Sequence, residues 1–307
     1  MGEIEVPLTN DSIESTASPA AKSRLDWQGM ALAAVKSPYF IPVAVFLGGL
    51  TLIYWELLSS LIRLWMGEDG YYTHGFLVPI ISGYLIYRMW PRLKEIRISP
   101  SMWSLLLLLP MLWVAFVARA VQMQSLYSVS FVFVLISGVW FVFGWRWALA
   151  TAAPILYLLF ALPVWSGFVT NYTNPLQIIS TKIAYRMLDM VGSPHMPPNS
   201  TDILIGNFWL NVGVPCSGLK LVLAITAFTC FFVLIGGLRW WGNIAMFLAI
   251  VPLCLVINGL RIALIGMVGS QYGSDAGMQF HDFSGYITLI VCFFILFKLA
   301  RVLGWKD

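Results

Sequence analysis

Long apolar runs separated by short polar segments cover most of this chain after residue 38. A helix needs about 20 mainly apolar residues to cross the hydrocarbon layer of a membrane, which is about 30 Å thick. Judged by that length, the pattern predicts eight spans and an all-α polytopic membrane fold. The expected spans are residues 39–65, 75–90, 101–120, 124–144, 147–168, 217–237, 240–267 and 283–304.

The polar segments outside these runs indicate how the chain is organised. Residues 1–26 are polar and rich in Ser and Thr, and residues 27–35 are mildly apolar but too short a run to cross a membrane. We therefore expect a disordered cytoplasmic tail over residues 1–36, before a transmembrane domain over residues 37–307. The only long polar interval of that domain is 169–216. Apolar residues recur at helical spacing over 174–191, so we expect an amphipathic helix on the membrane surface there.

The end of this interval has the pattern of a short β-hairpin. Apolar and aromatic residues flank the turn dipeptide Gly206-Asn207, which favours two short strands. The second of these strands leads directly to Cys216. The sequence therefore predicts a hairpin immediately before the sixth span.

Composition agrees with a membrane protein and excludes several functions. The chain is 59% hydrophobic and 10% charged, with a mean hydropathy of +0.82, which excludes an ordinary soluble domain. Its four cysteines have no CxxC spacing, which argues against a disulfide framework or a zinc ribbon. The three histidines are far apart and no HExxH motif occurs, so we expect no metal or other cofactor. A net charge of +4 gives no reason to expect nucleic acid as a partner.

The basic residues indicate which side of the membrane each segment faces. Lys and Arg gather in loops on the cytoplasmic side, and eight spans would leave both termini on one side. Twelve of the 18 basic residues lie on the side of the termini: Lys22, Arg24, Lys36, Arg88, Arg92, Lys94, Arg97, Arg146, Arg239, Lys298, Arg301 and Lys306. Both termini should therefore be cytoplasmic, with the loops 66–74, 169–216 and 268–282 outside.

Three reactive or charged residues interrupt the apolar C-terminal third: Cys216, Arg261 and His281. In the expected topology Cys216 begins the sixth span, Arg261 lies one to two turns below the outer surface, and His281 immediately precedes the eighth span. All three therefore meet at the outer leaflet. A nucleophile, a fixed cation and a titratable base are the groups that covalent acyl transfer requires.

Each of the three also has a simpler interpretation. Cys216 can be a buried structural thiol, Arg261 a side chain that extends to the interface, and His281 an interfacial histidine. Two neighbours favour the functional interpretation. Lys220, one turn after Cys216, should lower the thiol pKa together with the helix N-terminus, and Asn258 shares a helix face with Arg261.

Other polar residues offer alternatives for the base or for structure. His74 lies just before the second span, also outside, and is a second candidate base. His195 lies in a Pro-rich segment, which is a poor place for fixed geometry. Glu56, inside the first span, is a costly intramembrane charge that we expect to pair with an Arg in a structural role.

Four segments of the chain are similar to motifs of one family of membrane enzymes. They are Thr73-His74-Gly75-Phe76-Leu77-Val78-Pro79; Asn174-Pro175-Leu176-Gln177 followed by Ser180, Ala184, Leu188 and Gly192; Cys216-Ser217-Gly218-Leu219; and Asn258-Gly259-Leu260-Arg261-Ile262 with His281 and Gly285. In this order and topology, the chain resembles the exosortase/archaeosortase family of membrane cysteine transpeptidases over nearly everything from residue 50 to 305.

The resemblance implies a role for each site residue. Cys216 would be the nucleophile, Arg261 the oxyanion or substrate-positioning group, and His281 the general acid/base, with Lys220, Asn258 and His74 in support. The implied substrates are exported proteins with a C-terminal Pro-Glu-Pro-type motif, a transmembrane helix and a basic tail, cleaved through a Cys thioester. The implied location is the bacterial inner membrane, with the active site on the periplasmic side and the lipid bilayer as surroundings.

Two other classes of function remain open from the sequence. A polytopic transporter would have inverted repeats and polar residues at mid-membrane, and we find neither a repeat nor that placement. A non-catalytic scaffold of envelope polysaccharide export is the other alternative. Both would tolerate replacement of Cys216, whereas a thiol transpeptidase would not.

Overall fold

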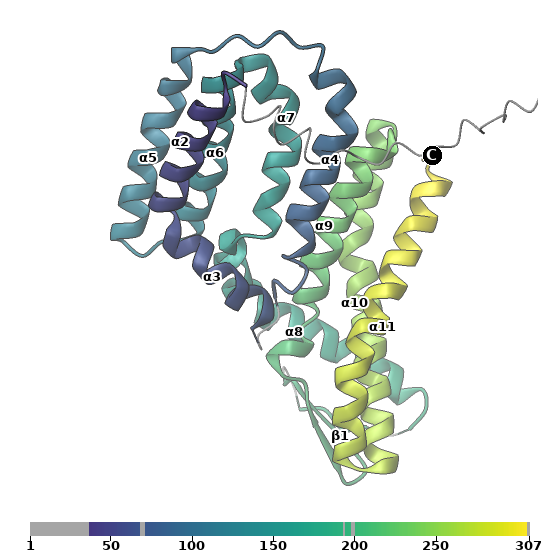
Figure 1. The fold of residues 1–307 in the computed structure, drawn as a ribbon. Coiled ribbons are helices and arrows are strands. Elements are labelled where there is room, and N and C mark those ends of the chain that lie inside the picture. The colour runs from purple at the N-terminus through teal and green to yellow at the C-terminus, as the bar shows by residue number, and fades with distance from the viewer. Residues whose placement is uncertain (1–36, 68–70, 193, 198–199, 306–307) are drawn as a thin grey trace, which may run out of the picture. The chain divides into compact units, whose positions relative to one another are not determined.

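In the computed structural model, the described chain consists of helices and one small sheet (Figure 1). The structure describes residues 37–67, 71–192, 194–197 and 200–305. The tail expected to be disordered, residues 1–36, lies outside the described residues. Two compact units divide the chain, Met1–Ala44 and Val45–Asp307, with the boundary inside helix α2 (Phe40–Ile53).

Helices make up most of the second unit. They are α3 (Trp55–Met66), α4 (Leu77–Leu93), α5 (Leu105–Ala120), α6 (Gln124–Phe143), α7 (Trp145–Tyr157), α8 (Ser166–Asp189), α9 (Leu219–Gly236), α10 (Trp240–Tyr272) and α11 (Ser274–Val302), with short 3-10 turns η1 (Met102–Ser104), η2 (Leu158–Phe160), η3 (Pro163–Trp165) and η4 (Val214–Cys216). Strands β1 (Asp202–Ile205) and β2 (Phe208–Asn211) pair antiparallel around Gly206 and Asn207. The predicted all-α fold with a hairpin before the sixth span is therefore confirmed.

Among the residues that the structure describes, five helices are long and apolar enough to cross a membrane: Met102–Ala120, α6, α9, α10 and α11. Two bent pairs raise the number to seven if each is one span. The bend is 70° between α2 and α3, and 63° between Trp145–Phe160 and Pro163–Asp189. The second bend falls at Pro163, whose missing N–H cannot continue a helix.

The eight predicted spans correspond only in part to the described helices. The expected span 75–90 is α4, whose 17 residues extend about 26 Å, slightly less than the apolar layer of a typical membrane. The expected spans 39–65 and 147–168 fall on the two bent pairs. The chain is a multi-pass membrane protein, with some of its helices inclined to the others.

The segment 268–282, expected to be an outer loop, is helical except at Gly273, whose φ of +93° is in the region that favours glycine. Helix α10 has 33 residues, a length of about 50 Å, and it exceeds the apolar layer even at a tilt of about 40°. Part of α10 therefore extends beyond the apolar layer, where a helix can carry polar residues. The prediction of a loop over 268–282 was wrong because these residues lack the apolar pattern by which a membrane helix is recognised.

A cluster of buried side chains joins α8, the hairpin and α10. Its members are Ala184, Leu188, Ile203, Leu210, Val212, Cys216, Ile262, Ala263 and Ile265. Helix α8 and the hairpin lie at the same end of α10 and α11 in Figure 1, and both contact α10. The expected helix over 174–191 is thus part of α8, which begins earlier, at Ser166. This cluster fixes the position of Cys216.

One intramembrane charge has the kind of partner expected from the sequence. The Glu56 carboxylate, in the first turn of α3, lies 3.1 Å from the Arg119 guanidinium at the end of α5. The pair joins two helices that are far apart in the chain. Neither residue belongs to the buried cluster that contains Cys216.

Candidate active site

Cys216 lies at the junction between the hairpin and helix α9. The chain leaves β2 at Asn211, forms the 3-10 turn Val214–Cys216, and then reverses at Gly218, which precedes α9 with a φ of +81°. A Cβ atom on Gly218 would lie 3.0 Å from the Asn258 side-chain nitrogen, so glycine is required both for the conformation and for the close approach. That nitrogen donates to the Cys216 carbonyl at 2.7 Å. Asn258 therefore holds the backbone of the cysteine.

The thiol of Cys216 contacts the imidazole of His281. The Sγ–Nε2 distance is 2.9 Å, and Nδ1 of the same ring lies 3.0 Å from Oδ1 of Asp282. Cys216 is 8% exposed, and the His281 side chain is 24% exposed. His281 lies inside α11 rather than before a span, because the helix begins at Ser274. A nucleophile, a base and an acidic group that orients the base are thus in line.

Arg261 connects α10 to the backbone of α11 beside this pair. Its Nε donates to Ser284 Oγ at 3.1 Å, and Nη2 donates to the His281 carbonyl at 2.9 Å. Both acceptors are neutral, and within the described residues Arg261 makes no ion pair. A guanidinium has five N–H donors, so three remain available to a negatively charged group.

The electrostatics of Cys216 differ from the prediction. Burial raises the pKa of the thiol above its ordinary value, and the positive charge of Arg261 opposes that shift. Lys220 does not contribute to the shift; it lies in the first turn of α9 with an exposed side chain. The expected lowering of the pKa by Lys220 and the helix N-terminus is therefore wrong, because desolvation of the thiolate is the larger effect. The resting group is a thiol that needs a base.

His74, the second candidate base, is buried and makes no hydrogen bond with Cys216 among the described residues. Burial lowers the pKa of His74 to about 4, with the charge of Lys220 acting in the same direction and a backbone hydrogen bond at Phe160 opposing it. Its Nδ1 has no hydrogen-bond partner in the part of the chain that the structure describes. His74 is therefore a neutral imidazole near Lys220. His195 is exposed and pairs through its backbone with Leu204.

Helix α8 supplies two further contacts to the backbone around Cys216. Gln177 donates its side-chain amide to the Val212 carbonyl, and Ser180 Oγ donates to the Ser217 carbonyl at 3.3 Å. Both side chains are buried. Gln177 and Ser180 are three residues apart, so they lie on the same face of α8. Two polar residues at this spacing are the sequence feature that could have indicated their role beside Cys216.

Sequence reasoning did not assign a role to Asp282 or Ser284. Asp282 follows His281 directly and Ser284 is one helical turn further, so both become evident once this segment is helical. Asp282 was missed because it fell in the expected loop 268–282, and Ser284 because it fell at the start of the expected span 283–304, where its hydroxyl was not assigned a partner. Asp282 contacts the imidazole of His281, and Ser284 accepts a hydrogen bond from Arg261.

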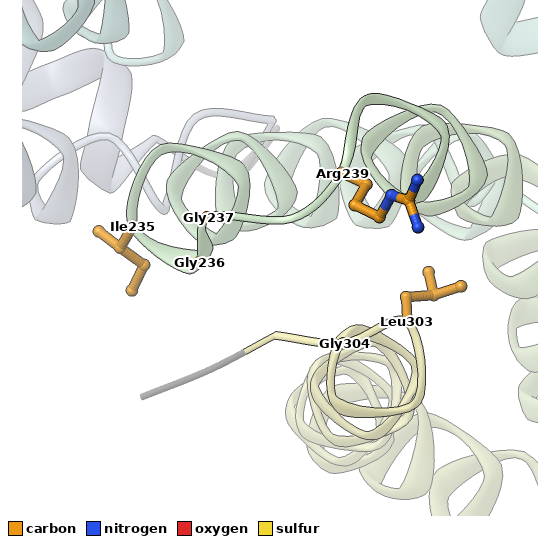
Figure 2. A pocket seen from close by; sticks show the side chains of 6 residues that line it. All are labelled: Ile235, Gly236, Gly237, Arg239, Leu303 and Gly304. Atoms are coloured by element: carbon orange, nitrogen blue, oxygen red, sulfur yellow. The ribbon is translucent and has the colours of Figure 1, made fainter.

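One cavity among the described residues lies away from this cluster. It has a volume of about 450 Å³ and is lined by Ile235, Gly236, Gly237, Arg239, Leu303 and Gly304 (Figure 2). The 18 residues of α9 separate it from Cys216, roughly 27 Å along the helix axis. None of these six lining residues is a nucleophile, so this cavity offers no alternative to Cys216.

The direction of the pKa shift gives a testable expectation for thiol reactivity. Because the pKa is raised, little thiolate exists at neutral pH, and alkylation of Cys216 by iodoacetamide should increase with pH to a midpoint above that of an ordinary cysteine. Arg261→Gln removes the charge that lowers the pKa, so its midpoint should lie higher still. Mass spectrometry of the Cys216 peptide measures both. A midpoint below that of an ordinary cysteine, or a lower one in Arg261→Gln, would contradict this electrostatic account.

Comparison with known proteins identifies the family. A family model described as transmembrane exosortase matches residues 65–298, which is most of the chain and includes Cys216, Arg261 and His281. No curated protein and no solved structure matches the chain. Exosortases are membrane proteases or transpeptidases of the cysteine type, in agreement with a thiol and an imidazole in contact. The chain therefore belongs to the transmembrane exosortase family.

Proposed function

We propose that this protein cleaves C-terminal sorting signals of exported proteins through a thioester on Cys216. The observation that carries the proposal is the 2.9 Å contact between Cys216 Sγ and His281 Nε2. A buried thiol with a raised pKa needs an adjacent base to become a nucleophile, and His281 occupies that position.

The contacts support a role for each group in acylation. His281 Nε2 accepts the thiol proton as Sγ attacks the carbonyl carbon of the scissile bond. The oxygen of that carbonyl becomes negative and is stabilised by the free N–H donors of Arg261. The tetrahedral intermediate then collapses, the C–N bond breaks, and His281 transfers its proton to the leaving amine. The product is a thioester between Cys216 and the substrate.

Deacylation reverses these roles. An amine from the cell envelope, or water, loses its proton to His281 and attacks the thioester carbonyl. The thiolate leaves and regains the proton from His281. Asp282 keeps the imidazole in one orientation throughout, since it accepts at Nδ1 while Nε2 faces the sulfur.

The proposed orientation places Cys216 on the periplasmic side of a bacterial inner membrane, with both termini in the cytoplasm. Basic residues support it. Arg239, at the start of α10, and Arg301, at the end of α11, lie at the ends of their helices opposite to the Cys216 cluster. Lys and Arg at one end mark that end as cytoplasmic.

The proposal is tested by co-expression with a reporter that ends in a Pro-Glu-Pro motif, a transmembrane helix and a basic tail. We expect the wild-type protein to remove the tail, seen as a shorter reporter with a new C-terminus by mass spectrometry. A matched reporter with Ala-Ala-Ala in place of Pro-Glu-Pro should stay intact. Processing of both reporters alike, or of neither, would contradict recognition of this signal. A transporter or scaffold would leave both intact.

A further inference from the structure

Strand β2 has one edge that is free and that leads to Cys216. The Val212 N–H donates to the Thr201 carbonyl at 2.9 Å, and the register pairs Ile203 with Leu210. Hydrogen-bonded pairs alternate along an antiparallel ladder, so the N–H and C=O groups of Phe208 and Leu210 face β1. Those of Trp209 and Asn211 face the opposite edge.

The two edges of this sheet differ in occupancy. On the β1 edge, Leu204 exchanges two backbone hydrogen bonds of 2.8 Å with His195, and the Asp202 N–H donates to Ser200 Oγ at 3.0 Å. On the β2 edge, the backbone groups of Trp209 and Asn211 have no hydrogen-bond partner among the described residues. An unpaired strand edge is a template for another extended chain.

The hairpin packs against α10 through one face, and this packing does not involve the outer edge of β2. Phe208 packs toward Gly269 and Leu210 toward Gly266, so one face of the hairpin rests on α10. The side chains on the other face are exposed, Trp209 at 57% together with Asn211. Anchored by its face, β2 keeps a rigid edge accessible.

Sequence continuity connects the edge to the thiol. Cys216 follows the end of β2 by five residues, and its N–H donates to the Gly213 carbonyl at 2.9 Å. Gln177 and Asn258 hold the same stretch at Val212 and at Cys216. A peptide paired with β2 would therefore be guided along a fixed path toward Sγ.

We propose that the substrate docks as a third strand on the free edge of β2. This inference rests on the proposed function and adds how the substrate is recognised: an extended segment beside the scissile bond, bound through its backbone. Strand β2, Phe208–Asn211, spans about 13 Å, enough for about four substrate residues. Backbone pairing fixes the register of the scissile carbonyl, and side chains then select the sequence.

The first test uses variants that remove one outward N–H without touching the ladder to β1. Proline at 209 or 211 does this, since those N–H groups face away from β1. Trp209→Pro and Asn211→Pro should react about 5- to 30-fold more slowly with a peptide chloromethyl ketone than the matched Trp209→Ala and Asn211→Ala, which keep the N–H. Alkylation of Cys216 by iodoacetamide should be equal within each pair. Equal rates with the peptide probe in both members of each pair would overturn the proposal.

The second test uses the wild-type protein, so that its outcome does not depend on the folding of a variant. A methyl group on one backbone nitrogen of the peptide probe should slow labelling by a similar factor, whereas a methyl on the next nitrogen should not, because successive N–H groups face opposite sides of a strand. No difference between the two methylated probes would overturn the proposal. If β2 instead pairs with a second copy of this chain, Asn211→Cys should form an intermolecular disulfide that the probe does not prevent, which also overturns it.

These labelling tests are separable from the test of the proposed function. They measure how fast a peptide reaches Cys216, and not whether the reporter is cleaved. Loss of reporter processing with preserved discrimination between the methylated probes would contradict the sorting function alone. Normal processing without that discrimination would contradict the third-strand docking alone.

Discussion

Cys216→Ala is expected to lose at least about 10³-fold in the rate of reporter processing, because no thioester can form without the sulfur. The measurement is the rate at which the reporter tail disappears, at matched levels of enzyme in the membrane. Cys230→Ala is the matched control. Cys230 lies in the middle of α9, among the apolar residues around Val78 and Tyr157, and should retain nearly full activity.

The opposite pattern would have a clear meaning. If Cys216→Ala processes the reporter as well as the wild type, the cysteine is a structural residue of the buried cluster that it joins. Another protein would then cleave the reporter, and a transporter or a scaffold would again be possible functions of this chain. Reduced processing in both variants would indicate a general loss of packing.

His281→Ala should lower the processing rate by about 10²- to 10⁴-fold, the range for loss of a general base. The backbone carbonyl of residue 281 remains, so the hydrogen bond from Arg261 is retained and the change is confined to the imidazole. Alkylation of Cys216 at high pH should still occur, because hydroxide then replaces the base. The pH dependence of processing separates this result from misfolding: the remaining activity should rise with pH.

Asp282→Asn provides the graded comparison. The Asp282 side chain is 76% exposed and its effect on His281 is screened by water, so we expect a loss of about tenfold or less. A loss as large as that of His281→Ala would show that the carboxylate does more than orient the ring. Wild-type activity in His281→Ala would remove the imidazole from the mechanism.

The sequence was sufficient to predict the parts of the fold that depend on local pattern. The apolar runs of α6 and α9 end within a few residues of their expected limits, and the hairpin turn is at Gly206-Asn207 as expected. These elements satisfy their hydrogen bonds locally, so their pattern is sufficient. The ends of α10 and α11 were misjudged, because polar helical residues outside the membrane resemble a loop.

The residues of the candidate site could be predicted from the sequence, but the hydrogen bonds between them could not. Cys216 and His281 were chosen for their chemistry and their place at run ends, and the structure puts them in contact. Asn258 was expected to share a face with Arg261, yet its side chain holds the Cys216 carbonyl. His74 was the second candidate for the base, but the thiol makes its hydrogen bond with His281. Such contacts depend on how helices distant in sequence pack, which no local pattern encodes.

The sign of the thiol pKa shift also lay beyond the sequence. A helix N-terminus and Lys220 favoured a lowered value, but the burial of Cys216 between α8, α10 and the hairpin raises it. The extent of burial is a property of the assembled cluster. It bears on the proposed mechanism, because a thiol with a raised pKa requires a base such as His281 to become the nucleophile.

The most direct test of the central claim is intact-mass analysis of the purified protein, quenched in acid during reporter cleavage. The account predicts an added mass equal to the acyl part of the reporter, located on the Cys216 peptide and released by hydroxylamine as expected for a thioester. His281→Ala should accumulate far less of this adduct, and Cys216→Ala none. Cleavage of the reporter by the wild type with no adduct on Cys216, and equal cleavage by Cys216→Ala, would contradict the account.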